Sequence, residues 1–95
     1  MQLEIITPES EVFKGEAEAV QFPGLEGSFQ VLKGHAPVIS ALAEGDVKVN
    51  LIAAFEGDSE NEAIKVDKGD NKTIRVAIKG GVIEMQNDKI IVLAE

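Results

Sequence analysis

Short apolar runs with a period of two residues limit most strongly what this chain can fold into. In VKVNL, which begins at Val47, the valines and the leucine fall on one side of an extended chain, and the lysine and asparagine fall on the other. Residues 74–79 (IRVAIK) alternate in the same way. Alternate side chains of a strand point to opposite faces, whereas a helix repeats every 3.6 residues. The chain is therefore expected to be built from strands.

Turn-forming residues divide the rest of the chain into further short runs of this kind. The segments Lys14-Gly15, 23–27, 44–46, 68–72 and 86–88 carry the glycine, proline, asparagine and aspartate that favour turns. Strands are predicted at 2–6, 12–13, 17–22, 28–32, 38–42, 47–51, 64–66, 74–78, 82–85 and 90–93. About ten short strands with regular turn signals predict an antiparallel all-β sandwich or barrel.

Length and charge exclude several classes of protein. The 95 residues allow one domain, 1–95, with one core. The formal net charge of -8, from 17 acids against 9 bases, is opposite to what free nucleic-acid or anionic-membrane binding needs. No apolar run reaches the roughly 20 residues of a membrane span, and the first residues lack a targeting pattern. We expect a soluble acidic protein with no nucleic acid, no membrane insertion and no small-molecule substrate.

His35 is the only histidine and the first candidate for chemistry. A general base needs a carboxylate to orient it and a nucleophile or substrate beside it, and no Ser/His/Asp arrangement stands out. A loop histidine that bonds its own turn or a partner is therefore favoured. The acids of 56–62 lack the ligand spacing of an EF-hand, and lysines flank the acids of 67–71, so solvated turns are favoured over metal sites. Catalytic, metal and cofactor residues are accordingly predicted to be none.

Two glycine pairs are candidates for ligand-binding loops, but the residues around them do not support this interpretation. Gly24 and Gly27 precede neither a Gly-Lys-Ser/Thr ending nor a helical pattern, so they do not make a phosphate loop. Gly80-Gly81 is expected to mark a bulge or a close approach of two backbones.

Four stretches together resemble the epsilon subunit of the F-type ATP synthase. They are LEIITPE from residue 3, PGLEGSFQVLKGHAPVISAL from residue 23, GDVKV from residue 45 and GGVIEMQNDKIIVLAE from residue 80. The most specific part is the segment of 23–37 that ends in Gly-His-Ala-Pro. The resemblance runs in the family's order from residue 3 to residue 95, and only 51–72 carries little of it.

The resemblance implies a flattened ten-stranded antiparallel β-sandwich on the rotor of the synthase. There the domain would sit in the central stalk, dock the gamma subunit onto the c-ring and help couple ion flow to ATP synthesis. It would perform no bond chemistry and bind no cofactor. The location implied is peripheral, on the cytoplasmic face of a bacterial inner membrane, with a plastid-encoded origin as the second alternative.

The resemblance also assigns contact residues. The c-ring contacts would be Glu26, Gly27, Ser28 and Gln30, and the gamma contacts would be Thr7, His35, Ala36 and Pro37. Gly34 and Pro37 would hold the His35 loop in one shape, which limits the ordering cost of docking. Ser28, Gln30 and Lys33 depart from residues common in the family, so Glu26 could supply a compensating carboxylate.

The end of the chain and two rival classes complete the expectations. Longer family members continue into a helical hairpin that inhibits ATP hydrolysis, whereas this sequence ends at Glu95, so the chain is either a short member or part of a longer one. As given, it should lack that inhibitory arm. The rivals are a lipoyl- or biotinyl-type carrier, with Lys89 as the nearest modified lysine, and an enzyme built on His35. The carrier lysine would stand at a hairpin tip, and the spacing around Lys89 does not fit.

Overall fold

The computed structural model describes residues 1–55 and 63–95, and these residues form nine strands and no helix. The acidic segment 56–62 lies outside the described residues. No helix long and apolar enough to cross a membrane occurs in the described part of the chain. The strands are β1 (Gln2–Ile6), β2 (Glu11–Gly24), β3 (Gly27–Leu32), β4 (Val38–Leu42), β5 (Gly45–Leu51), β6 (Ile64–Asp67), β7 (Asp70–Ile78), β8 (Gly81–Gln86) and β9 (Lys89–Ala94).

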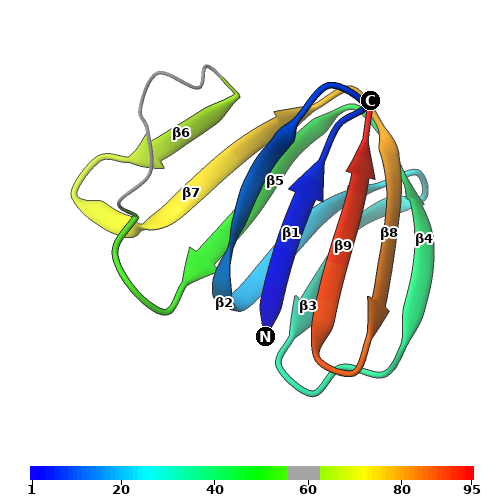
Figure 1. Ribbon diagram of the computed structural model, residues 1–95, viewed down its shortest axis with the longest axis horizontal. Coiled ribbons are helices and arrows are strands. Elements are labelled where there is room, and N and C mark those ends of the chain that lie inside the picture. Colours follow the sequence, from blue (N-terminus) through cyan, green and yellow to red (C-terminus); the bar gives the residue numbers. More distant parts are fainter. Residues whose placement is uncertain (56–62) are drawn as a thin grey trace.

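The strands stack as two layers that share one long strand, β2 (Figure 1). The first half of β2 pairs with β1, and the layer continues through β9, β8 and β4. The second half of β2 pairs with β3 on one side and with β5 on the other, and that layer continues through β7 to β6. The predicted all-β sandwich is confirmed, and its extents of 30 × 27 × 22 Å are moderately flattened.

The predicted break at Lys14-Gly15 is wrong, because β2 runs through it without interruption. Gly15 pairs with Leu3 in the regular antiparallel register. A Cβ at Gly15 would lie 2.9 Å from the Phe13 ring, so the ring covers the glycine. The glycine makes room for a core phenylalanine on its own strand and does not mark a turn.

β2 changes layers at an irregularity between Ala17 and Ala19. Before it, Phe13 and Ala17 are buried at odd positions; after it, Val20 and Phe22 are buried at even positions. One extra residue reverses which side chains face the core and bends the strand. The bend lets one strand contribute to both layers.

One pairing departs from the antiparallel pattern. β1 and β9 run parallel, with Gln2 opposite Lys89 and Ile6 opposite Leu93, whereas the other pairings between the described strands are antiparallel. The first and last strands of the chain thus lie side by side in Figure 1. Alternation within a single strand carries no information about the direction of its neighbour.

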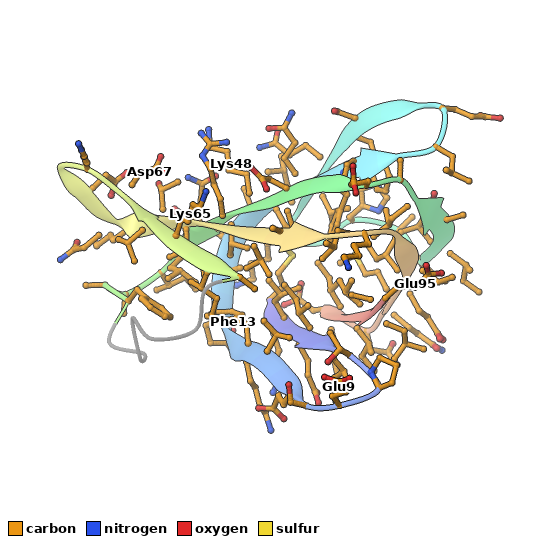
Figure 2. All side chains as sticks on the ribbon, turned by 90° about the horizontal axis from the view of Figure 1, so that it is seen from above. Glu9, Phe13, Lys48, Lys65, Asp67 and Glu95 are labelled. Atoms are coloured by element: carbon orange, nitrogen blue, oxygen red, sulfur yellow. The ribbon has the colours of Figure 1, made fainter. Side chains whose placement is uncertain are left out.

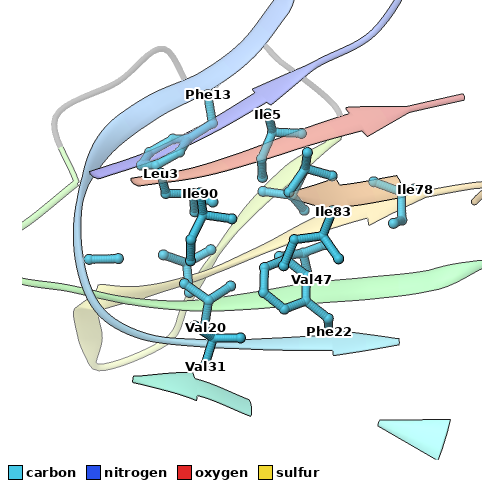
Figure 3. Close-up of a cluster of buried hydrophobic side chains, with 14 of the residues drawn as sticks. Leu3, Ile5, Phe13, Val20, Phe22, Val31, Val47, Ile78, Ile83 and Ile90 are labelled. Carbon is cyan, nitrogen blue, oxygen red and sulfur yellow. The ribbon is translucent and has the colours of Figure 1, made fainter. Parts of the chain in front are cut away.

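The core lies between the two layers and is apolar. Figure 3 shows Leu3, Ile5 and Ile90 facing Val20, Phe22, Val31 and Val47 across it. The rings of Phe22 and Phe29 are 5.5 Å apart, a spacing typical of packed aromatic pairs. Among the described residues only one polar side chain, Thr73, is buried. The predicted alternation of Val47, Val49 and Leu51 is confirmed, since all three are buried.

Three turns are shorter than predicted. The β2–β3 turn consists of Leu25 and Glu26, because Pro23, Gly24 and Gly27 already belong to the strands. The β6–β7 turn is Lys68-Gly69, and the β8–β9 turn is Asn87-Asp88. Asn87 and Asp88 have φ angles of 53° and 60°, as a type I′ hairpin turn requires. Two-residue turns fix the register of the hairpins and leave little slack at their tips.

The expected close approach at Gly80-Gly81 is confirmed at Gly81. This residue has φ 147°, and a Cβ there would clash with the Leu93 carbonyl oxygen on β9. Gly27 offers a matched comparison, because its φ is 127° but a Cβ there would meet open space. Gly81 is therefore required both by its backbone conformation and by its neighbour.

We predict that Gly81→Ala destabilises the fold by at least about 1 kcal/mol more than Gly27→Ala. Both changes strain the backbone, but only the first forces atoms together, and overpacking costs about 1–3 kcal/mol. Urea unfolding of the two variants and the unchanged chain measures the difference. Equal free energies of unfolding for both variants would show that the approach of Gly81 to β9 relaxes without cost.

Candidate functional site

The loop that carries His35 joins β3 to β4 and is tied to itself. The His35 backbone N–H donates to the Leu32 carbonyl oxygen at 3.0 Å. The His35 Nδ1 lies 2.6 Å from the Ala36 carbonyl oxygen, which can only accept, so Nδ1 carries the proton. Of the two roles expected for this histidine, the bond to its own turn is confirmed, and contact with a partner stays a prediction. His35, Ala36 and Pro37 are exposed, so they form a surface.

The same loop is also fixed from the opposite end of the chain. The Gly34 N–H donates to the Asp88 Oδ1 at 3.3 Å, which joins the loop to the β8–β9 turn. A second Asp88 oxygen lies 3.7 Å from the Met1 amine, and the Asp88 carbonyl accepts the Gln2 N–H at 3.1 Å. Asp88 therefore anchors both the His35 loop and the start of β1. Sequence reasoning did not identify Asp88, which is 53 positions from His35 and carries no motif.

The predicted c-ring residues lie at the tip of the β2–β3 hairpin. Glu26, Gly27, Ser28 and Gln30 are all exposed, and Ser28 and Gln30 point away from the core while Phe29 packs on it. An open groove of about 560 Å³ runs beside the tip, between residues 24–29 and Ile39, Ser40 and Ala41 of β4. The hairpin tip thus offers both polar side chains and a hollow for a partner.

Thr7 does not lie beside the His35 loop. It follows β1, where its Oγ1 exchanges hydrogen bonds of 3.2 Å with the Ser10 backbone. The His35 loop contacts Asp88 at the other end of the parallel strand β9. Five residues of strand, about 17 Å, separate the two positions along the sandwich. A single partner that touches both must extend over the length of the layer.

An exposed apolar face covers the outside of that layer, and sequence reasoning missed it. The cross-strand row Ala41, Val82, Leu93 and Ile6 spans β4, β8, β9 and β1. Ile39 and Ile91 stand in the next row, where Glu84 lies between them and Glu4 lies beyond Ile91 on β1. Ile39 is 74% exposed, Leu93 58% and Val82 42%. We call the six apolar residues of these two rows the apolar face. The available signal was IIVL at 90–93, where apolar residues occupy both faces of one strand.

The outside of the other layer is polar. Asn50 Nδ2 donates to Thr73 Oγ1 at 3.2 Å, and Thr73 Oγ1 donates to Asp70 Oδ2 at 2.7 Å. The Lys72 N–H donates to the other Asp70 oxygen at 3.0 Å. These bonds, led by the one from Thr73, hold the pKa of Asp70 below its usual value of 3.8. The bonds join β7 to β5 close to the β6–β7 turn.

The described residues do not assemble a catalytic or metal constellation. Within 1–55 and 63–95, no group of three or more histidine, aspartate and glutamate side chains is close enough to hold a metal. Lys89 does not stand at a hairpin tip, because Asn87 and Asp88 form the turn and Lys89 is already paired with Gln86 and Gln2. The exposed surfaces described so far are the His35 loop, the β2–β3 tip and the apolar face.

Comparison with known proteins identifies the family to which this chain belongs. Residues 1–56 match the family model of the ATP synthase delta/epsilon chain, beta-sandwich domain. The chain belongs to this family. An ATP synthase epsilon chain of Chlorobium limicola is 34% identical over 99% of this chain and 88% of its own length. One of Salinibacter ruber is 38% identical over the whole of this chain, which spans only 58% of that relative. The resemblance inferred from the motifs is confirmed.

Solved structures of ATP synthases share the fold. A chain of the Euglena gracilis mitochondrial ATP synthase, in a structure of its OSCP, F1 and c-ring, matches 97% of this chain and 48% of its own. Its TM-score is 0.71 at 20% identity. A chain of the Tetrahymena thermophila central stalk and c-ring structure matches 98% of this chain and 63% of its own, with TM-score 0.66 at 17% identity. At these identities the likeness shows the fold alone.

We predict that Asp70→Asn destabilises the protein at neutral pH and that the difference disappears in acid. Because the pKa of Asp70 is lowered in the folded state, its contribution is present above the unfolded value near 3.8. That contribution is lost as the pH falls through the folded pKa. Urea unfolding of both proteins from neutral pH to about pH 2 checks this. A difference that persists unchanged in acid would mean that the charge of Asp70 contributes nothing.

Proposed function

We propose that this chain is a rotor subunit in the central stalk of an F-type ATP synthase, where it docks gamma onto the c-ring and helps couple ion flow to ATP synthesis. Membership of the delta/epsilon family supports the assignment to this complex. The observation that carries the docking role is the apolar face, because contiguous exposed apolar surface on a small domain marks a contact with another protein.

We assign the apolar face to gamma, together with Thr7, His35, Ala36 and Pro37. Pro37 immediately precedes β4, and Thr7 immediately follows β1, so the two lie at opposite corners of this face. A gamma surface laid diagonally across β4, β8, β9 and β1 would reach both. This arrangement accounts for the separation of Thr7 from the His35 loop.

We assign the β2–β3 tip to the c-ring, through Glu26, Gly27, Ser28 and Gln30. These residues lie at or beside a two-residue turn and are exposed, so a loop of the partner can reach them. A short, register-fixed hairpin loses little conformational freedom on docking. The tip and the apolar face adjoin at β4, where the Leu25 N–H donates to the Ala41 carbonyl oxygen at 3.4 Å. One subunit could therefore hold gamma and the ring at once.

The role we propose involves no bond chemistry in this chain. Its side chains would act only by shape, apolar contact and charge, and they would transmit force between two partners. The location that follows is peripheral, on the cytoplasmic face of a bacterial inner membrane. The structural requirement is rigidity, which the continuous core and the two-residue turns provide.

We predict that Ile39→Asp weakens binding to gamma of the same organism by about tenfold or more, because a carboxylate would be buried against apolar surface. Ile52→Asp is the matched control, since Ile52 is also exposed, at 54%, but follows β5 in the other layer. His35→Ala should weaken binding less, because it removes one loop contact. Calorimetry measures the affinities, and light scattering checks the 1:1 ratio. Equal affinities for Ile39→Asp and Ile52→Asp would exclude the apolar face as the gamma surface.

We predict that Glu26→Ala weakens association with the purified c-ring by a few-fold, as expected for one exposed charge. Glu9→Ala is the control, because Glu9 is an exposed acid in the β1–β2 connection, away from the tip. Binding in detergent at low salt, with labelled chain, provides the measurement. An unchanged affinity for Glu26→Ala would remove this carboxylate from the proposed contact.

A further inference from the structure

A row of three bases crosses the outer face of β5, β7 and β6. Lys48 lies directly opposite Arg75, and Arg75 lies directly opposite Lys65, so their side chains project from the same face. Figure 2 shows Lys48 and Lys65 close together with Asp67 on one face of the molecule. We call Lys48, Arg75 and Lys65 the basic row. With strands about 4.8 Å apart, it spans about 10 Å.

The basic row is conspicuous because the chain as a whole is acidic. Residues 64–75 contain four bases and two acids, a balance of +2, whereas the whole chain carries -8. The other residues therefore carry -10, and Lys48 adds a further base to the positive side of the molecule. Asp46 is the acid that shares the outer face of β5, two residues from Lys48. Positive charge is concentrated here while the remainder of the chain repels anions.

The acids beside the basic row neutralise only part of its charge. Asp67 Oδ1 lies 3.3 Å from the Arg75 Nε, which orients the guanidinium and leaves its two Nη groups to donate elsewhere. Asp70 is engaged by Thr73 and the Lys72 N–H. Among the described residues, neither Lys48 nor Lys65 forms an ion pair. Two ammonium groups and part of a guanidinium thus face outward together.

Structural explanations account for only part of the arrangement. A lysine on a short edge strand such as β6 prevents edge-to-edge aggregation, which explains Lys65. It does not explain Lys48, which is on β5 between β2 and β7. Like charges directly opposite each other destabilise a sheet, so the row is unfavourable for the isolated fold. A ligand that supplies negative charge would remove this repulsion.

We propose that the basic row docks an acidic polypeptide segment of another protein. Charge complementarity selects the occupant, and a flat three-stranded face suits an extended segment with several carboxylates. The β6–β7 hairpin lies at the end of the long axis opposite the β2–β3 tip (Figure 1). This surface is therefore separate from those assigned to gamma and the c-ring, and the inference does not depend on that proposed function.

The test is a titration of the isotope-labelled chain with a short oligo-glutamate peptide at low salt, followed by NMR. The basic-row variant is Lys48→Gln/Lys65→Gln/Arg75→Gln, and the charge-matched control is Lys14→Gln/Lys33→Gln/Lys89→Gln. We expect amide shifts along β5, β6 and β7, and binding about tenfold weaker in the basic-row variant. The control variant should bind like the unchanged chain, and added salt should weaken binding.

Several results would overturn the proposal. They are absence of binding, equal weakening in both variants, and peptide binding that appears only after the acids of 56–62 are neutralised. Row-dependent binding of the chain to vesicles of anionic lipid without any binding of the peptide would instead identify a membrane surface. Lys65→Gln separates a binding role from a structural one. Because the substitution relieves repulsion, the melting temperature of the variant should not fall. A lower melting temperature would show that Lys65 stabilises the fold.

Discussion

The structure depends on one constraint within β2. Odd-numbered residues point toward the core in its first part, and even-numbered residues do so in its second part. Because side chains of a strand alternate strictly, one inserted residue changes which positions point toward the core. The irregularity between Ala17 and Ala19 adds one residue, so Phe13 packs under the first layer and Phe22 packs under the second. β2 pairs with four strands, β1, β3, β4 and β5. The N-terminal and C-terminal strands can then close the first layer side by side.

The two layers have outer faces of opposite character, and this difference organises the proposed functions. The apolar face covers β4, β8, β9 and β1, while the basic row and the Asp70 network cover β5, β7 and β6. Apolar surface contributes to affinity through burial, whereas exposed charge mainly guides partner choice and approach. A domain with this division can hold one partner firmly and contact a second in a salt-dependent way. Neither contact needs a pocket deep enough for a substrate.

Strand alternation predicted most of the fold because each short strand has one buried face. The runs at 47–51 and 74–78 were correct for this reason, since their valine, leucine and isoleucine side chains all face the core. Gly15 was misread because a glycine that accommodates the Phe13 ring and a glycine in a turn have the same sequence. Two further features could not be predicted from the sequence pattern. They are the parallel pairing of β1 with β9 and the anchoring of the His35 loop by Asp88. Both arise from contacts between distant parts of the chain.

The proposed contact residues differ in how they are held, and this bears on how such a subunit would transmit force. The His35 loop is fixed by its own hydrogen bonds and by Asp88, which also holds the start of β1. The β2–β3 tip continues directly into the strand that joins the two layers. A load applied at either place would therefore pass into backbone hydrogen bonds of the sheets and not into a hinge. Close packing of the core resists shear between the layers, so rotation imposed at one surface would reach the other with little loss.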